Sequence, residues 1–254
     1  MNNNASRDGL LPWIRSAIYY LLMVPSLIVL FILIVIVSPF QYRYRALLIR
    51  YWALLQMWLL KMCCGLSYEV QGTENLPDSP YIALPKHQSA WETIASNFLF
   101  RQPAWVFNRR LFKIPVFGWG LYLTHPVGID RGSPRAALAQ LIEQGDRLLK
   151  SGRTMVIFPE GTRVPPGETA KFEPGGSLLA VKTGTPVVPV ALNAGEFWPR
   201  NSFRKYPGHI KVIIGPLIES EGIKARELND RVEAWINDTM DEHFDNRTVS
   251  SSAV

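Results

Sequence analysis

Short apolar runs alternate with longer segments of helical periodicity from about residue 66 onward, and this alternation predicts an α/β domain. The run at 187–192 is apolar throughout, which is typical of a strand covered on both faces, so we expect a mostly parallel or mixed sheet flanked by helices. Pro189 inside this run lacks a backbone N–H, which favours an edge strand or a bulge. The expected strands lie at 67–70, 81–84, 105–107, 126–129, 155–158, 187–192 and 209–214, and the expected helices at 90–100, 134–150, 176–183 and 224–244.

The N-terminal part has a different pattern. The residues from 17 to 38 carry no charge, and this run is long enough to cross the ~30 Å hydrocarbon core of a bilayer. No small-residue cleavage site follows it, so we predict an uncleaved membrane helix. A second apolar segment, 46–65, contains Arg50 and Lys61 and fits an interfacial or hairpin helix better than a second span. An ordinary core helix, or two helices that dip into one leaflet, remain open alternatives.

This change of pattern divides the chain into membrane-anchoring helices at 1–65, an α/β domain at 66–245 and a disordered tail at 246–254. Arg43, Arg45 and Arg50 follow the apolar run, so the distribution of positive charge favours a catalytic domain on the cytoplasmic side of the membrane.

Composition narrows the classes of partner. The net charge is +6 and the pI is near 9.4, which suits acidic lipid surfaces, phosphorylated substrates or nucleic acid. The basic residues are dispersed, without an RNA-binding aromatic signature or zinc-finger spacing, so we do not expect nucleic acid. The two cysteines, Cys63 and Cys64, are adjacent, and the histidines lack metal-binding spacing, so we expect neither a disulfide framework nor a metal site.

Polar clusters follow the expected strands one after another. His87 comes after 81–84, Asp130 and Arg131 come after 126–129, and Glu160-Gly-Thr-Arg163 comes after 155–158. In open α/β sheets the ligand crevice lies at the carboxyl ends of the strands. If the strands are parallel, these clusters meet in one pocket.

His87 and Glu92 are the candidate catalytic pair. On a regular helix a separation of five residues would turn the two side chains about 140° apart, so His87 must precede the helix and Glu92 must lie in its first turn. A dyad would leave one imidazole nitrogen free to take a proton from an alcohol. The alternative is that Ser89 and Glu92 form a capping box and that Glu92 only caps the helix.

The segment at 158–163 is a candidate anion site. Gly161 can adopt a positive φ and expose backbone N–H groups, and Arg163 can hold a phosphate with two hydrogen bonds. The alternative is a glycine turn with a solvated arginine, and Arg131 could equally form a salt bridge with Asp130 or Glu160. Weaker candidates for the site are Lys86, Arg109, Lys171 and Asn193.

Four motifs in this order and spacing resemble those of the glycerolipid acyltransferases: KHQSAWE at 86–92, GIDRG at 128–132, FPEGTR at 158–163 and VVPVALN at 187–193. Within that family the chain looks most like the 1-acyl-sn-glycerol-3-phosphate acyltransferases. The resemblance covers roughly residues 66–215, and the apolar N-terminus also fits the family's two-helix membrane element.

The resemblance implies a membrane-bound enzyme that moves a fatty acyl group from acyl-CoA or acyl-carrier protein to the sn-2 hydroxyl of lysophosphatidic acid, giving phosphatidic acid for phospholipid synthesis. It implies His87 as general base and Glu92 as its orienting acid. Backbone N–H groups near Gly161 are our own candidates for the oxyanion site. The resemblance implies no cofactor beyond the acyl donor. The residues that it places around the acceptor phosphate are Arg131, Glu160, Gly161, Thr162 and Arg163.

Two positions depart from the family's pattern. Glu92 stands where the usual residue is Asp, and Asn108 stands where many relatives carry Lys. Either change could mark another acceptor, so an acyltransferase for a different lysophospholipid or lipid remains an alternative. A non-catalytic membrane protein that binds anionic lipid through the same arginines is the alternative from another class.

Overall fold

The computed structural model describes residues 9–114, 117–130 and 132–244. A seven-stranded sheet has the order β1-β7-β6-β2-β5-β3-β4, and every pairing is parallel except the antiparallel pair β6–β7. The predicted α/β class with a mixed sheet is therefore confirmed. The strands are β1 (Leu66–Gln71), β2 (Ile82–Pro85), β3 (Ala104–Asn108), β4 (Val127–Ile129), β5 (Met155–Val156), β6 (Val187–Leu192) and β7 (Gly208–Ile214).

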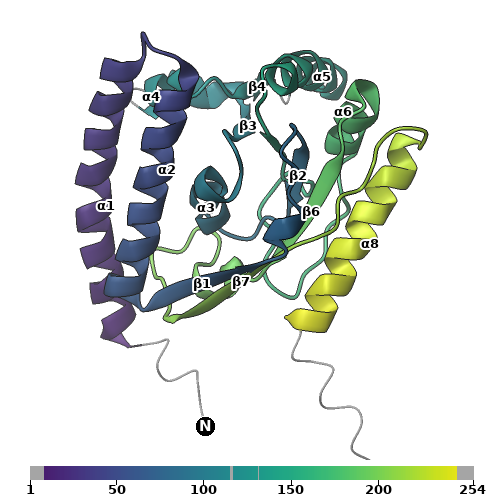
Figure 1. The fold of residues 1–254 in the computed structure, drawn as a ribbon. Coiled ribbons are helices and arrows are strands. Elements are labelled where there is room, and N and C mark those ends of the chain that lie inside the picture. Colours follow the sequence, from purple (N-terminus) through teal and green to yellow (C-terminus); the bar gives the residue numbers. More distant parts are fainter. Residues whose placement is uncertain (1–8, 115–116, 131, 245–254) are drawn as a thin grey trace, which may run out of the picture.

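Helices cover both faces of this sheet (Figure 1). They are α1 (Leu10–Val37), α2 (Tyr42–Leu59), α3 (Trp91–Leu99), α4 (Phe117–Leu123), α5 (Pro134–Lys150), α6 (Gly175–Thr183), α7 (Ala194–Phe197) and α8 (Ala225–His243), with shorter turns η1 (Leu60–Cys64), η2 (Thr73–Asn75) and η3 (Arg109–Lys113). Side chains of β2 alternate between two cores: Ala83 joins the cluster that includes α3 and the N-terminal helices, whereas Ile82 and Leu84 join the one under α5, α6 and α8.

Pro189 does not mark an edge, because β6 lies inside the sheet between β7 and β2. The expectation of an edge strand was wrong, but the alternative of a bulge agrees with the register. The ladder with β7 ends at Val190↔Ile214 and resumes as a single bridge at Val187↔Ile218, so fewer residues of β6 face more residues of the partner segment. Pro189 sits in this interruption, and its carbonyl oxygen accepts from Gly215 N at 2.9 Å.

The two N-terminal helices form an antiparallel pair that lies along one side of the α/β domain (Figure 1). By length and composition, α1 is long and apolar enough to cross a membrane, and so is α2 when it is continued through η1 to Cys64. Between them, Ser26 Oγ accepts from Trp52 Nε1 and from Gln56 Nε2, each at 3.1 Å. This polar contact fixes how α1 and α2 face one another, because a misaligned pair would leave these groups without partners.

Both ends of this helical pair are attached to the α/β domain. Near the start of α1, Ser16 Oγ accepts from Lys205 N at 2.8 Å. At the other end, Arg45 donates to Leu123 O at 2.8 Å, and the buried Arg153 donates to Tyr42 Oη at 2.7 Å. Arg45 is thus part of the packed structure, which removes one of the flanking charges from the argument about membrane orientation.

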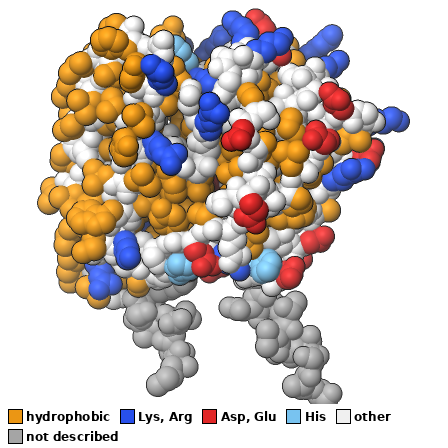
Figure 2. Space-filling view, in the orientation of Figure 1, with side chains coloured by type: hydrophobic (Ala, Val, Ile, Leu, Met, Phe, Trp, Pro, Cys, Tyr) orange, Lys and Arg blue, Asp and Glu red, His pale blue; other side chains and the backbone are white. Residues whose placement is uncertain are grey.

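The outer face of the helical pair is strongly apolar, and Figure 2 shows apolar side chains gathered on the side of α1 and α2 while charged side chains gather on the opposite side. Exposed apolar side chains gathered on one face, rather than scattered singly, are typical of an interaction surface. The exposed side chains on α1 include Leu10, Leu11, Trp13, Ile14, Ile18, Leu21, Leu22, Val24, Ile28, Val29, Ile32 and Ile36, and on α2 they include Tyr44, Leu47, Tyr51, Leu55 and Trp58.

The boundary predicted at residue 65 falls between η1 and β1, at Gly65 with φ +66°. The division into domains stays a prediction, and the tail predicted at 246–254 lies outside the described residues.

Candidate active site

The loop that carries His87 begins where β2 ends at Pro85 and leads into α3. Lys86 N still donates to Val190 O of the neighbouring strand at 2.9 Å, which holds the start of the loop to the sheet. The helix begins at Trp91, whose N–H is accepted by Ser89 Oγ at 3.1 Å. His87 therefore precedes the helix and Glu92 lies in its first turn, which is the arrangement that the spacing of the two residues requires.

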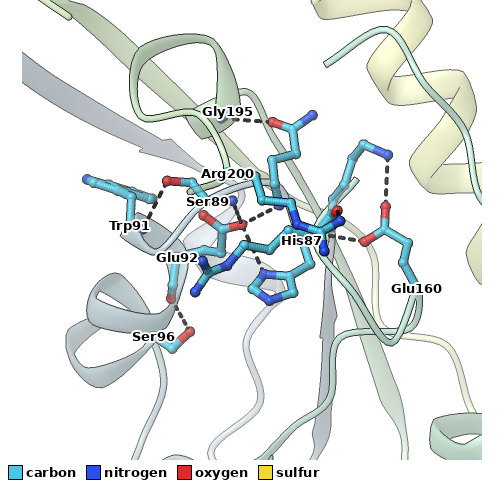
Figure 3. A network of polar contacts seen from close by, with 11 residues as sticks. His87, Ser89, Trp91, Glu92, Ser96, Glu160, Gly195 and Arg200 are labelled. Carbon is cyan, nitrogen blue, oxygen red and sulfur yellow. Dashed lines mark hydrogen bonds and ion pairs between the residues drawn. The ribbon is translucent and has the colours of Figure 1, made fainter. Parts of the chain in front are cut away.

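One carboxylate oxygen of Glu92 serves the histidine and the helix start together. Glu92 Oε1 lies 3.2 Å from His87 Nδ1 and accepts from the backbone N–H groups of Gln88 and Ser89 at 2.5 and 2.6 Å (Figure 3). Glu92 Oε1 thus makes the contact with His87 that a dyad needs, and it also holds the backbone just before the helix, where the N-cap residue is Ala90 and not Ser89. Because a carboxylate accepts, this contact places the imidazole proton on Nδ1 and leaves Nε2 as a proton acceptor.

The imidazole ring of His87 is fixed from a second side by Phe158. The two rings are stacked with centroids 3.7 Å apart and an interplanar angle of 12°. The side chain keeps 14% of its surface exposed, so the ring is positioned yet still reachable. Among the described residues, none donates to or accepts from Nε2, which leaves that atom available to a substrate.

The backbone of His87 is bonded on both sides to the segment at 158–164. Its N–H donates to Glu160 Oε2 at 2.6 Å, and its carbonyl oxygen accepts from Val164 N at 2.8 Å. The prediction that the His87 cluster and the Glu160–Arg163 cluster meet in one place therefore agrees with the structure. Parallel strands β2 and β5 bring the two loops together at the same edge of the sheet.

The Glu160 side chain is buried inside the protein. Its carboxylate accepts from Lys86 Nζ at 2.9 Å and from the His87 N–H, and its side chain has no exposed surface. Burial raises the pKa of Glu160 above its ordinary value, and the Lys86 ammonium opposes that shift. The assignment of Glu160 to the acceptor phosphate is corrected accordingly: the carboxylate is turned inward and already holds two donors.

The turn after Glu160 brings the remaining candidates to the surface. Gly161 has φ +65°, as expected, but its N–H donates to Phe158 O at 3.0 Å and is therefore not free for an anion or an oxyanion. Thr162 is exposed and Arg163 is partly exposed. The Arg163 carbonyl oxygen accepts from Arg200 Nη1 at 2.9 Å (Figure 3).

The other candidates are dispersed. Arg131 lies outside the described residues. Arg109 and Lys171 are exposed, and no distance ties either of them to His87. Asn193 Oδ1 accepts from Lys211 N at 2.9 Å, so its side chain holds β7 against the end of β6 and has a structural task. Among the described residues there is no group of three or more His, Cys, Asp or Glu side chains that could hold a metal ion.

Sequence reasoning missed three contributors. Phe158 was part of the candidate motif, but its stacking on His87 has no signature in the sequence. Gln88 Oε1 accepts from Gly195 N at 3.1 Å and so ties the loop to the start of α7. Arg200 supports the Arg163 backbone from a loop outside every motif, and only a contact map could have found it.

A histidine oriented by a carboxylate, with a free ring nitrogen and without a nearby cysteine or serine nucleophile motif, fits direct transfer of a group to an alcohol. The model of the acyltransferase family matches residues 67–193, which is half of the chain. The chain belongs to the acyltransferase family, and the protein is an enzyme of that class.

Individual relatives indicate which members of the acyltransferase family this chain resembles. The chain is similar to the 1-acyl-sn-glycerol-3-phosphate acyltransferase of Pseudomonas aeruginosa, with 46% identity over 90% of this chain and 91% of that protein. A chloroplastic 1-acyl-sn-glycerol-3-phosphate acyltransferase of Brassica napus is 30% identical over 89% of this chain and 67% of that protein. The crystal structure of the 1-acyl-sn-glycerophosphate acyltransferase PlsC from Thermotoga maritima matches with a TM-score of 0.76 at 25% identity, over 91% of this chain and 97% of that chain. The resemblance stated from the four motifs is confirmed.

Proposed function

We propose that the protein transfers a fatty acyl group from a thioester donor to the sn-2 hydroxyl of lysophosphatidic acid, and that His87 is the general base. The observation that carries this proposal is the orientation of His87, whose Nδ1 is held by Glu92 while Nε2 is free. The acceptor is supported by the relatives, since those in Pseudomonas aeruginosa and Brassica napus are named for 1-acyl-sn-glycerol-3-phosphate. Acyl-CoA and acyl-carrier protein are both suitable donors, and no resident cofactor is needed.

The chemistry follows from the geometry of the pair. His87 Nε2 takes the proton of the acceptor hydroxyl as its oxygen attacks the thioester carbonyl carbon. Glu92 stabilises the imidazolium that forms, because its charged oxygen lies 3.2 Å from Nδ1. When the tetrahedral intermediate collapses, the carbon–sulfur bond breaks and the imidazolium returns the proton to the leaving thiolate. No covalent acyl-enzyme is required.

The membrane part of the proposal rests on the helical pair. Because α1 and α2 are attached to the α/β domain near both ends, they do not leave the domain as free-standing spans. We therefore propose that their outer apolar face inserts into one leaflet. In addition, α2 packs against α3, the helix that begins beside the His87 loop, so this insertion would place the site close to lipid substrates.

Purified protein mixed with phospholipid vesicles tests the proposed function. The expected result is that the protein sediments with the vesicles and converts lysophosphatidic acid to phosphatidic acid, with one thiol released per product. The acceptor panel should include matched lysolipids without a phosphomonoester, and the donor panel should include acyl-CoA and acyl-carrier protein. Equal turnover of acceptors without a phosphomonoester, or product formation without a thioester donor, would contradict the proposal.

Replacing Arg163 by alanine is expected to raise the acceptor KM about tenfold or more with a smaller change in kcat. A charged hydrogen bond to phosphate is worth about 1.5–3 kcal/mol, and it is made to the ground state and the transition state alike. Arg147→Ala is the matched control, because Arg147 is an exposed arginine on α5 paired with Glu143. A change in donor KM alone would reassign the loop to the acyl donor.

A further inference from the structure

A buried ion pair lies beside the backbone of the proposed base. Lys86 Nζ and Glu160 Oε1 are 2.9 Å apart, and the two side chains are 4% and 0% exposed. The second oxygen of the same carboxylate, Oε2, accepts the His87 N–H at 2.6 Å (Figure 3). Both carboxylate oxygens are thus engaged away from solvent. Burying two charges is costly unless they are paired and hydrogen-bonded, and here the pair and the His87 N–H together satisfy both oxygens of the carboxylate.

We propose that Lys86 and Glu160 are positioning residues for acyl transfer: Glu160 fixes the His87 backbone, and Lys86 holds the Glu160 carboxylate in the orientation that does so. This inference rests on the proposed function, because it takes His87 as the base. It gives Glu160 a task different from contact with the acceptor, and it gives Lys86 a task without any contact with substrate.

The position of the imidazole depends on supports from two segments. Glu92 fixes Nδ1 from α3, and Phe158 fixes the plane of the ring from the segment after β5. Glu160 belongs to the same segment as Phe158, and its bond to the His87 N–H keeps the backbone in register with the stacked ring. If that bond is lost, the carbonyl contact with Val164 still holds one side of the His87 backbone, but the N–H side is no longer tied to the segment that carries Phe158.

The ion pair makes this support dependent on charge. Burial raises the pKa of Glu160, and Lys86 is the first of the groups that oppose the shift. Removing either partner alone leaves an uncompensated buried charge, whereas replacing both by neutral residues of similar shape avoids that penalty. The single variants therefore test folding as much as position, and paired neutral variants are needed.

The decisive comparison is between Lys86→Met with Glu160→Gln and Lys86→Met with Glu160→Leu. Both double variants lack buried charge and have side chains of similar size, but only glutamine offers an oxygen to the His87 N–H. We expect the glutamine variant to keep kcat within about tenfold of the wild type, and the leucine variant to be at least about tenfold slower again. Thermal unfolding and the acceptor KM should be similar in the two.

Each result has a defined meaning. Equal kcat in the two double variants would overturn the positioning role, and a raised acceptor KM with unchanged kcat in both would return Glu160 to the acceptor site. The exposed pair Lys150 and Asp146, 2.7 Å apart on α5, is the matched control: Lys150→Met with Asp146→Asn should leave kcat unchanged. Wild-type protein that fails to acylate lysophosphatidic acid with any donor would sink the proposed function and this inference together, whereas an active enzyme insensitive to Glu160 sinks the inference alone.

Discussion

Replacing His87 by alanine is expected to lower kcat by about 10²- to 10⁴-fold, the usual contribution of a positioned general base. The free Nε2 is the atom that takes the acceptor proton, and alanine offers no substitute. The acceptor KM should change little, because the proposed phosphate contact comes from Arg163 in another loop. The measurement is acyl transfer to lysophosphatidic acid together with thiol release from acyl-CoA.

The variant should remain folded, which makes the loss interpretable. Removing the ring forfeits its stacking on Phe158, a contact worth about 0.5–1.5 kcal/mol beyond buried area, and this is a small part of a domain's stability. The matched control is His243→Ala at the end of α8, where the histidine lies beside Glu242 with 36% of its side chain exposed. Turnover near the wild-type value in His87→Ala would refute the mechanism.

The strands could be predicted because each depends on a local pattern. The run at 187–192 is apolar at successive positions, and the structure buries all of β6 between two neighbours. Helix α5 agrees with the predicted range from Pro134 to Lys150, because Ser133 caps its start and its apolar residues share one face. Such signals lie within the element itself, so they do not require knowledge of the rest of the fold.

Helix α4 could not be predicted because its sequence, FGWGLYL, contains two glycines and favours no regular element. Its place is set by packing: a Cβ on Gly120 would lie 3.2 Å from the ring of Phe31 on α1, so glycine permits a close approach of the two helices. The antiparallel pairing of β6 with β7 likewise depends on contacts between distant segments. Neither the position of α4 nor the direction of the β6–β7 pairing can be predicted from a short stretch of sequence.

The candidate site likewise has one part that the sequence predicted and another that it did not. The spacing of His87 and Glu92 required His87 to precede α3 and Glu92 to lie in its first turn, and the structure has this arrangement. By contrast, the dipeptide Glu-Gly is compatible with a glutamate that faces solvent and with one that faces the interior. The sequence therefore did not predict which way Glu160 points. The overlooked signal was Lys86, which follows a fully buried strand: a lysine at that position needs a buried partner, and Glu160 is that partner.

Replacing Glu92 by glutamine is expected to lower kcat about 10²-fold or more while leaving the protein folded. Glutamine can present its carbonyl oxygen to the backbone N–H groups of Gln88 and Ser89, so the start of α3 keeps its cap. It cannot supply the negative charge that stabilises the imidazolium. Among the described residues, Glu92 Oε2 is buried without a hydrogen-bond partner, so an NH₂ placed there would cost about 1–3 kcal/mol.

The comparison with Glu92→Ala separates the two tasks of this residue. Alanine removes the charge and the cap, so kcat should fall and the free energy of unfolding should drop by about 1–2 kcal/mol. Thermal unfolding and acyl transfer measured on both variants give the distinction: a pure cap predicts wild-type kcat in the glutamine variant, whereas a dyad member predicts the same large loss of kcat in both. Glu227→Gln is the matched control, since Glu227 lies in the first turn of α8 and pairs with Arg231 at the surface. One oxygen of Glu92 performs both tasks. Only a variant that keeps a hydrogen-bond acceptor at this position and removes the negative charge can therefore show which task the reaction requires.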